Sequence, residues 1–198
     1  MNAAYAARKL DLASPQPMSR KVILTADDYG MCNSVNEAIE ECFRAGALRS
    51  TCVMVNMPAS CDAVSLRKDF PNASVGIHWD LTQGRPLLHP TKVSTLVHEG
   101  GQFLSVADLR YRWLLRRINP AEIKRELIEQ FRQFCSLAGP PDFWNTHQDV
   151  HIFPGLFQLF VSMGQELGIP AMRSHRRFTV PRQGTSNSHN CRHPLFWL

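Results

Sequence analysis

The sequence has no long hydrophobic run and no closely paired cysteines, and these two absences exclude several classes of protein. No window approaches the 18 or so consecutive apolar residues of a membrane span, so we expect no membrane partner. The six cysteines, at positions 32, 42, 52, 61, 135 and 191, form no C-x-x-C pair. The first four lie in or beside apolar segments, where a reduced cysteine packs as a small hydrophobe. We therefore expect a reducing, cytoplasmic location.

Charge is also not concentrated in any one region. The net charge is +5, from 22 Lys and Arg against 17 Asp and Glu. Small basic groups at 116–117, 124–125 and 173–177 are scattered and are not interleaved with the aromatic residues on which bases stack. They indicate a solvated surface, and we expect no nucleic-acid partner. A length of 198 residues with 44% hydrophobic content is typical of one globular domain.

The two ends of the chain lack the patterns of the middle. Residues 1–19 lack the long apolar segment of a signal peptide, and we interpret them as a disordered leader. Residues 179–198 show no alternation of strands and helices and no helix-cap signals, which predicts an irregular tail. The folded domain is expected over residues 20–178.

The middle of the chain alternates between strand and helix patterns. Short apolar runs predict strands at 22–26, 50–56, 74–82, 142–147 and 169–174. Between them, helices are predicted at 34–46 (with a capping box at 34–37), 60–71, from 105, 119–137 and 154–167. Residues 83–103 are rich in Gly and Pro and have little periodicity. The alternation predicts an α/β fold, with a parallel sheet of about five strands and helices outside it.

Polar side chains follow three of the predicted strands. Asp27 and Asp28 come after the first, His78 lies at the end of the third, and His147 and His151 follow the fourth. In parallel α/β folds, the carboxyl ends of strands gather the chemistry. One Asp and two His would suit a divalent metal ion with an open position for water. The other Asp could then accept a proton from that water.

Each of these features also has an ordinary structural explanation. A pair of aspartates after a strand is common in a turn that caps a helix. A single histidine such as His78 is often a hydrogen-bonded core residue, and His-x-x-x-His arises by chance on surface helices. The placement of all three features at the ends of separate strands favours a site.

Four segments in fixed order carry a resemblance to a known family. They are "TADDYG", "VNEAIEECFRAGALRSTCVMVN", "VGIHWDLTQGRPL" and "THQDVHIFPGL", within residues 20–173. Together they resemble the YdjC-like family of carbohydrate deacetylases. The resemblance implies a (β/α) barrel that removes N-acetyl groups from amino sugars or chitooligosaccharides. It also implies a bound divalent cation, usually Mg²⁺, with Zn²⁺ as the alternative.

The same resemblance suggests roles for five residues. Asp27, the first aspartate of "ADDYG", matches the proton acceptor. Asp28, His78 and His147 match three metal ligands. His151 resembles a histidine near the scissile group, where it could protonate the leaving amine or stabilise the oxyanion.

Two further positions match the family less closely. Asp149 stands where the family commonly has the middle histidine of H-x-H-x-H. It could contact the substrate, it could fix the tautomer of a histidine through a hydrogen bond, or it could be a neutral surface exchange. Arg173 lies where the family tends to have a substrate-facing arginine, although an ordinary surface arginine is an equal alternative.

The chain is short for the implied fold. A closed barrel usually needs about 200–250 residues, and only about five strands are predicted here. We therefore expect a partial barrel, truncated at its C-terminus, whose open edges favour either aggregation or pairing with a second copy in a homodimer. The leading functional hypothesis is a metal-dependent carbohydrate deacetylase acting on an N-acetylated sugar. The alternatives are a catalytically impaired relative that binds metal or sugar without turnover, and a different metal-dependent hydrolase such as a phosphoesterase.

Overall fold

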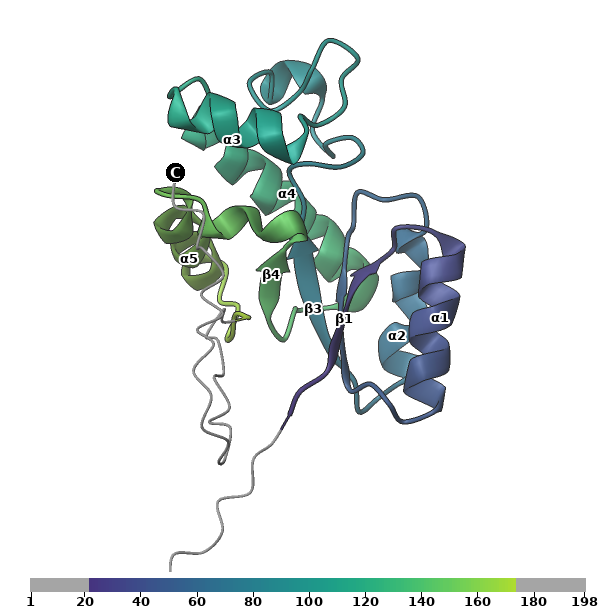
Figure 1. Cartoon of the computed structure of the whole chain (residues 1–198). Helices are drawn as coiled ribbons and strands as arrows, with labels where there is room; N and C mark the ends of the chain where they lie inside the picture. The colour runs from purple at the N-terminus through teal and green to yellow at the C-terminus, as the bar shows by residue number, and fades with distance from the viewer. Residues whose placement is uncertain (1–21, 174–198) are drawn as a thin grey trace, which may run out of the picture.

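A parallel sheet forms the centre of the computed structural model, which describes residues 22–173 (Figure 1). Its four strands lie in the order β1-β2-β3-β4 and every neighbouring pair is parallel. They are β1 (Thr25–Tyr29), β2 (Ser50–Val53), β3 (Ser74–Trp79) and β4 (Trp144–Thr146). The predicted α/β fold is confirmed, in the form of an incomplete (β/α) barrel. The predicted leader, and the tail at 179–198, lie outside the described residues.

Helices connect the strands and cover the sheet. They are α1 (Asn33–Arg44), α2 (Ala63–Asp69), α3 (Val106–Leu114), α4 (Pro120–Ala138) and α5 (Leu156–Glu166), with short 3-10 segments η1 (Ser60–Asp62), η2 (Pro90–Lys92) and η3 (His147–Ile152). In Figure 1, α1 and α2 lie together at one side of the sheet and α5 lies at the other, while α3 lies beyond the strands' carboxyl ends. Within the described residues, no helix is long and apolar enough to cross a membrane.

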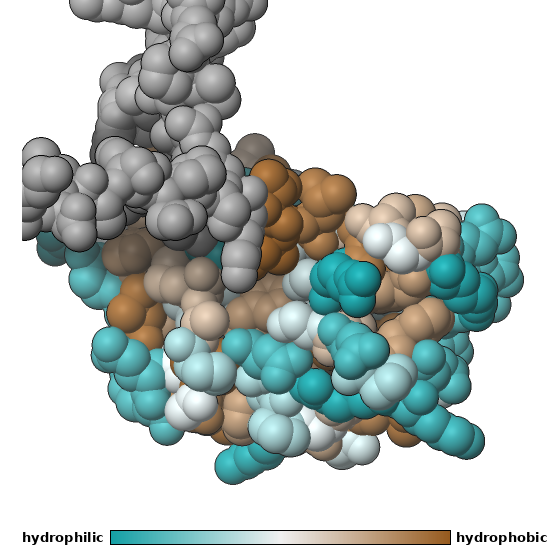
Figure 2. Space-filling model, turned by 90° about the horizontal axis from the view of Figure 1, so that it is seen from below, coloured by the Kyte–Doolittle hydropathy of each residue, from teal (hydrophilic) through white to brown (hydrophobic). Residues whose placement is uncertain are grey.

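The first strand begins later than the sequence predicted. The apolar run at 22–26 indicated a strand there, but the ladder with β2 starts at the Thr25–Ser50 pair. Val22, Ile23 and Leu24 precede the ladder and are 80%, 79% and 58% exposed. The start of the partner strand, and not hydrophobicity, sets where β1 begins. Figure 2 views this amino-terminal end of the sheet, where hydrophobic residues gather beside hydrophilic ones.

The predicted capping box of the first helix is wrong. The N-cap of α1 is Cys32, whose carbonyl oxygen accepts hydrogen bonds from the backbone N–H groups of Val35 and Asn36. The helix therefore starts before Ser34, which lies in its first turn and contacts the Cys32 thiol at 3.2 Å. The cap predicted for α4 is confirmed, because the Asn119 side chain accepts from the Ala121 N–H and Pro120 follows it.

Up to residue 173, where the described part of the chain ends, the fifth strand predicted at 169–174 is reduced to a single bridge. Met172 pairs with Trp144 of β4 in parallel orientation, and the Trp144 N–H donates to the Ala171 carbonyl oxygen. The Arg173 N–H donates back to the Trp144 carbonyl oxygen. This short pairing brings Arg173 to the edge of β4, near the carboxyl end of the sheet.

A polar stripe on α4 holds the long segment that the sequence left without structure. The carboxylate of Glu122 accepts from the N–H and hydroxyl of Thr95, and that of Glu126 accepts from the N–H groups of Leu87 and Leu88. One turn further along, Gln130 bonds the backbone of residue 80. Burial raises the pKa of Glu126. The segment after β3 is therefore fixed against the helix rather than loose.

The core beneath the carboxyl end of the sheet is aromatic. The rings of Trp79 and Trp144 lie 5.3 Å apart, and Phe160 of α5 packs 5.9 and 6.2 Å from them. Gly164 of α5 faces Trp144 so closely that no Cβ would fit without displacing the indole ring. This packing holds β3 and β4, which position the histidines described next, against α5.

Candidate metal and active site

A bulge in β1 determines how the two adjacent aspartates are presented. In a regular strand, neighbouring side chains point to opposite faces. Here the register with β2 shifts between Ala26 and Tyr29, and Asp28 has a φ of 66°. A bulge of this kind redirects side chains locally. Asp27 and Asp28 consequently lie within the end of β1, rather than after it, and both contact residues of the neighbouring strands.

Asp28, His78 and His147 form one cluster, as predicted. Oδ1 of Asp28 lies 3.0 Å from Nε2 of His78 and 2.9 Å from Nδ1 of His147. The two imidazole rings meet edge to face, with centroids 5.5 Å apart. The side chain of His78 is 2% exposed and that of His147 is 9% exposed, whereas the Asp28 carboxylate keeps 33% exposure. The cluster therefore has buried histidines and a carboxylate open to the solvent.

The electrostatics of the cluster favour a negative Asp28. Hydrogen bonds from His147 and His78 hold the pKa of its carboxyl well below the usual value. Burial opposes a charge on His147, but the hydrogen bond with Asp28 and the negative charges of Asp80, Asp28 and Asp27 outweigh it and raise its pKa. Without a metal, the site therefore favours a proton on His147 where a cation would otherwise supply positive charge.

Amide side chains hold the outer nitrogens of both histidines. Oδ1 of Asn145, in β4, lies 2.5 Å from Nδ1 of His78. Oε1 of Gln83, which follows β3, lies 2.8 Å from Nε2 of His147. Each ring is thus held between an amide oxygen on one side and Asp28 on the other.

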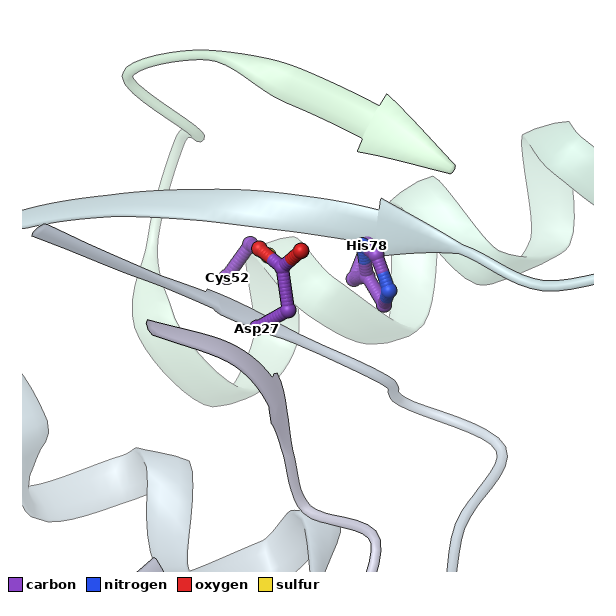
Figure 3. A group of neighbouring side chains, drawn as sticks. All are labelled: Asp27, Cys52 and His78. Carbon is purple, nitrogen blue, oxygen red and sulfur yellow. The ribbon is translucent and has the colours of Figure 1, made fainter. Parts of the chain in front are cut away.

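Asp27 has a separate set of partners. The Cys52 thiol lies 3.1 Å from its Oδ1, the Asn145 amide donates to the same oxygen over 3.2 Å, and the Arg173 guanidinium forms an ion pair with Oδ2. Figure 3 shows the Asp27 carboxylate directed between Cys52 and His78. Burial, followed by the charge of Asp27, raises the pKa of the Cys52 thiol. Cys52 is therefore a neutral hydrogen-bond donor to Asp27.

The donor set fits a divalent cation. One ligand atom each from Asp28, His78 and His147 lies within 4.8 Å of the others, and a carboxylate oxygen with two imidazole nitrogens is a common set for such ions. A second group, Asp27, Cys52 and His78, meets the same distance limit. It is less suited to a metal, because its thiol is buried and protonated and its carboxylate is already paired with Arg173.

The two remaining predicted residues lie in η3, directly after His147. His151 is fully buried, with its Nδ1 2.6 Å from the Thr146 hydroxyl and its ring 5.7 Å from that of Trp144. Asp149 is half-buried and has a φ of 53°, next to Gln148 with a φ of 52°. Two consecutive non-glycine residues with positive φ are a costly conformation, of the kind that is often found at functional sites.

Sequence reasoning found the cluster itself but missed the residues behind it. Asn145, Gln83 and Cys52 were not singled out, although each lies in a segment that was predicted to be a strand or to follow one. An amide in a fully buried strand, two positions before a candidate ligand, was the available signal for Asn145. No comparable pattern marked Gln83, because its contact with His147 spans 64 positions of the chain.

The comparisons with known proteins agree with the fold. The sequence profile of the YdjC-like protein family matches residues 21–196. The chain belongs to this family. It is 36% identical over 168 residues to a carbohydrate deacetylase of Geobacillus stearothermophilus, a match that covers 82% of this chain and 65% of that protein. It is 35% identical over 159 residues to a chitooligosaccharide deacetylase of Yersinia enterocolitica, covering 77% and 59%.

A solved structure extends the comparison to three dimensions. A crystal structure from Enterococcus faecalis V583, named for cellobiose-phosphate cleavage, superposes with a TM-score of 0.69 at 26% sequence identity. The superposition covers 79% of this chain and 59% of that one. This YdjC-like chain thus spans about three fifths of the length of the relatives that it matches.

Proposed function

We propose that this protein is a metal-dependent deacetylase that removes N-acetyl groups from amino sugars or chitooligosaccharides. The observation that supports this most directly is the cluster of Asp28, His78 and His147 at the strand ends, with Asp27 beside it. The deacetylase names of the relatives support the reaction class. Mg²⁺ is the proposed cation, with Zn²⁺ as the alternative for a site with two histidines.

Three residues would hold the cation and one would handle the proton. Asp28, His78 and His147 would bind a divalent ion, which supplies the positive charge that acidifies water and polarises a carbonyl. Asp27 accepts a proton from the attacking water. The thiol of Cys52, the amide of Asn145 and the guanidinium of Arg173 orient its carboxylate for that step. A general base placed in this way commonly contributes a factor of about 10² to 10⁴ in rate.

His151, Arg173 and Asp149 complete the proposal. His151 would protonate the departing amine or stabilise the oxyanion, with the Thr146 hydroxyl orienting its ring through Nδ1. Among the described residues, Nε of Arg173 is a buried donor without a hydrogen-bond partner, which suits contact with a substrate oxygen. Asp149 lies two residues from His147 and would face the same substrate. The cytoplasmic location and the homodimer remain part of the proposal.

Acetate release tests this function directly. The purified chain, supplied with Mg²⁺ or Zn²⁺, is incubated with N-acetylated chitooligosaccharides, and free acetate and free amine are both measured. The two products should appear in equal amounts. Release that is abolished by a chelator and restored by metal supports the proposal. Stoichiometric metal binding without any release would instead favour the impaired relative that binds without turnover.

An assay for phosphate-ester hydrolysis tests the alternative reaction, that of a phosphoesterase. Among the described residues, the only ligand groups share His78, so there is no independent second metal cluster of the kind that two-metal phosphoesterases use. Turnover of a phosphorylated sugar, in the absence of acetate release, would replace the proposed reaction with that one.

A further inference from the structure

The two histidines of the cluster face Asp28 with different ring nitrogens. His78 presents Nε2 to the Asp28 carboxylate, whereas His147 presents Nδ1. The opposite nitrogen of each ring lies at hydrogen-bond distance from an amide oxygen, which belongs to Asn145 for His78 and to Gln83 for His147. Each ring therefore lies between Asp28 and an amide oxygen, but the nitrogen that faces Asp28 is Nε2 in His78 and Nδ1 in His147.

The chemistry of the amides fixes where the hydrogens lie. An amide oxygen only accepts hydrogen bonds, so the ring nitrogen that faces it must be an N–H donor. His78 accordingly has its hydrogen on Nδ1, and His147 has a hydrogen on Nε2. In each ring the other nitrogen, Nε2 of His78 and Nδ1 of His147, faces Asp28 and is the atom available to bind a metal ion.

We propose that Gln83 and Asn145 are positioning residues that select opposite tautomers of the two histidine ligands, so that Nε2 of His78 and Nδ1 of His147 bind the same metal ion. This inference rests on the metal site of the proposed function and goes beyond it. It assigns each histidine a coordinating atom and gives two amides a role in the affinity of the site.

The amide of Asn145 and the backbone of Gln83 are themselves held in place. Asn145 is fully buried in β4, and its amide nitrogen donates to Asp27, which leaves its oxygen directed at His78. The backbone N–H of Gln83 donates to Oδ1 of Asp80 over 3.0 Å, and the Asn56 side chain donates to Oδ2 of Asp80 over 2.9 Å. These contacts fix the backbone of Gln83 at the start of the segment after β3, from which its side chain reaches His147.

The test compares variants that remove the amide oxygen with variants that keep an acceptor. Gln83→Met removes the oxygen with little change in shape, and Gln83→Glu retains it. Gln102→Met is the matched control, because Gln102 is exposed in the same segment. Mn²⁺ is the probe, since it binds carboxylate and imidazole and has little affinity for the thiols of this chain. The electron paramagnetic resonance signal of free Mn²⁺ gives the affinity without any substrate.

The expected result is a clear order of affinities. Gln83→Met should bind Mn²⁺ about 10 to 100 times more weakly than the unchanged chain, the usual cost of losing such a partner. Gln83→Glu and Gln102→Met should bind at least as tightly as the unchanged chain. Equal affinity of Gln83→Met and Gln102→Met would overturn the inference, as would an unchanged chain that binds no Mn²⁺.

A second pair of variants and a spectroscopic measurement guard against misfolding. Asn145→Asp keeps the acceptor for His78, and Asn145→Leu removes it, so only the second should lose affinity. In the Mg²⁺-loaded chain, long-range ¹H–¹⁵N spectra should show hydrogen on Nδ1 of His78 and on Nε2 of His147. The same tautomer on both rings would overturn the inference, even if all variants fold.

These outcomes are separate from those of the proposed function. If the unchanged chain releases acetate but Gln83→Met binds Mn²⁺ normally, the positioning role fails and the function stands. If no acetate is released but the affinities follow the expected order, the positioning role stands and the proposed reaction fails.

Discussion

The candidate site has two halves that are built in different ways. The histidine half consists of His78 in β3 and His147 directly after β4, and these two strands pair in regular register. The side chains of His78 and His147 are at most 9% exposed. The carboxylate half belongs to β1, where the ladder with β2 is bulged and Asp28 has a positive φ. The side chains of Asp27 and Asp28 are each 33% exposed.

The difference shows which half determines the geometry of the site. The histidines are held by a packed aromatic core and by amide partners, so they have little freedom. The backbone at Asp28 is strained, and such conformations persist only where surrounding contacts compensate for their cost. The two hydrogen bonds with the histidines supply that compensation here. The buried half therefore provides a rigid frame, and the exposed half adapts to it.

Removing a histidine from the rigid half should have the largest effect. His78→Ala deletes a ligand that no neighbouring residue can replace, so stoichiometric binding of a divalent metal should be lost in equilibrium dialysis. His89→Ala is the control, because His89 is exposed and its ring forms a hydrogen bond with Thr91, outside the cluster. Full binding by the His78→Ala protein would show that the ligand set is wrong.

Removing the charge of Asp27 tests whether the exposed half serves chemistry instead of affinity. Asp27→Asn keeps the size of the side chain but cannot accept a proton, so acetate release should fall by a factor of about 10² to 10⁴. Metal affinity, measured on the same samples, should change little. Asp69→Asn, in the exposed last turn of α2, is the control. A near-normal rate would exclude Asp27 as the base.

A change in the core beneath the histidines tests how much the frame depends on packing. Gly164→Ala introduces a methyl group against the Trp144 ring, where β4 packs against α5. Overpacking of this kind typically lowers the free energy of unfolding by about 1–3 kcal/mol. Urea unfolding of this variant and of Ser162→Ala, in the same helix, measures the difference. Equal midpoints would mean that α5 moves freely away from β4.

The smallest expected effect is the pH dependence of the metal-free chain. The pKa of Asp28 is lowered from 3.8, so its contribution to stability is present above pH 3.8 and is lost as the pH falls. The pKa of His147 is raised from 6.5, so its contribution is complete below pH 6.5 and is lost as the pH rises through the raised pKa. With chelator present, the pair should stabilise the chain most between pH 3.8 and 6.5.

Asp28→Asn isolates this contribution. The melting temperature of the unchanged chain should exceed that of the variant by a few degrees inside the window and by less above it. Subtracting the two curves removes the contributions of Asp80 and Glu126, whose pKa values burial raises in both proteins. A difference that does not change with pH would show that the Asp28–His147 pair does not titrate as the structure indicates.

The sequence alone determined the alternation of elements and the residue types of the cluster. Hydrophobic runs and cap residues are local signals, so the strands near 50, 74 and 144 and the start of α4 at Pro120 could be read directly. The strand-end positions of Asp28, His78 and His147 predicted a common site, since parallel strands end at one edge of the sheet. These predictions needed only periodicity and topology.

Other features depended on contacts that the sequence does not show. The start of β1 at Thr25 and the bulge at Asp28 follow from pairing with β2, and hydrophobicity pointed to the wrong residues. The packing of the segment after β3 against α4 depends on buried carboxylates that helical periodicity does not mark. Gln83, Cys52 and Asn145 became part of the site only when chain segments up to 118 positions apart came together. Sequence patterns record the preferences of single segments, whereas the contacts of Gln83, Cys52 and Asn145 with the site depend on how those segments pack together.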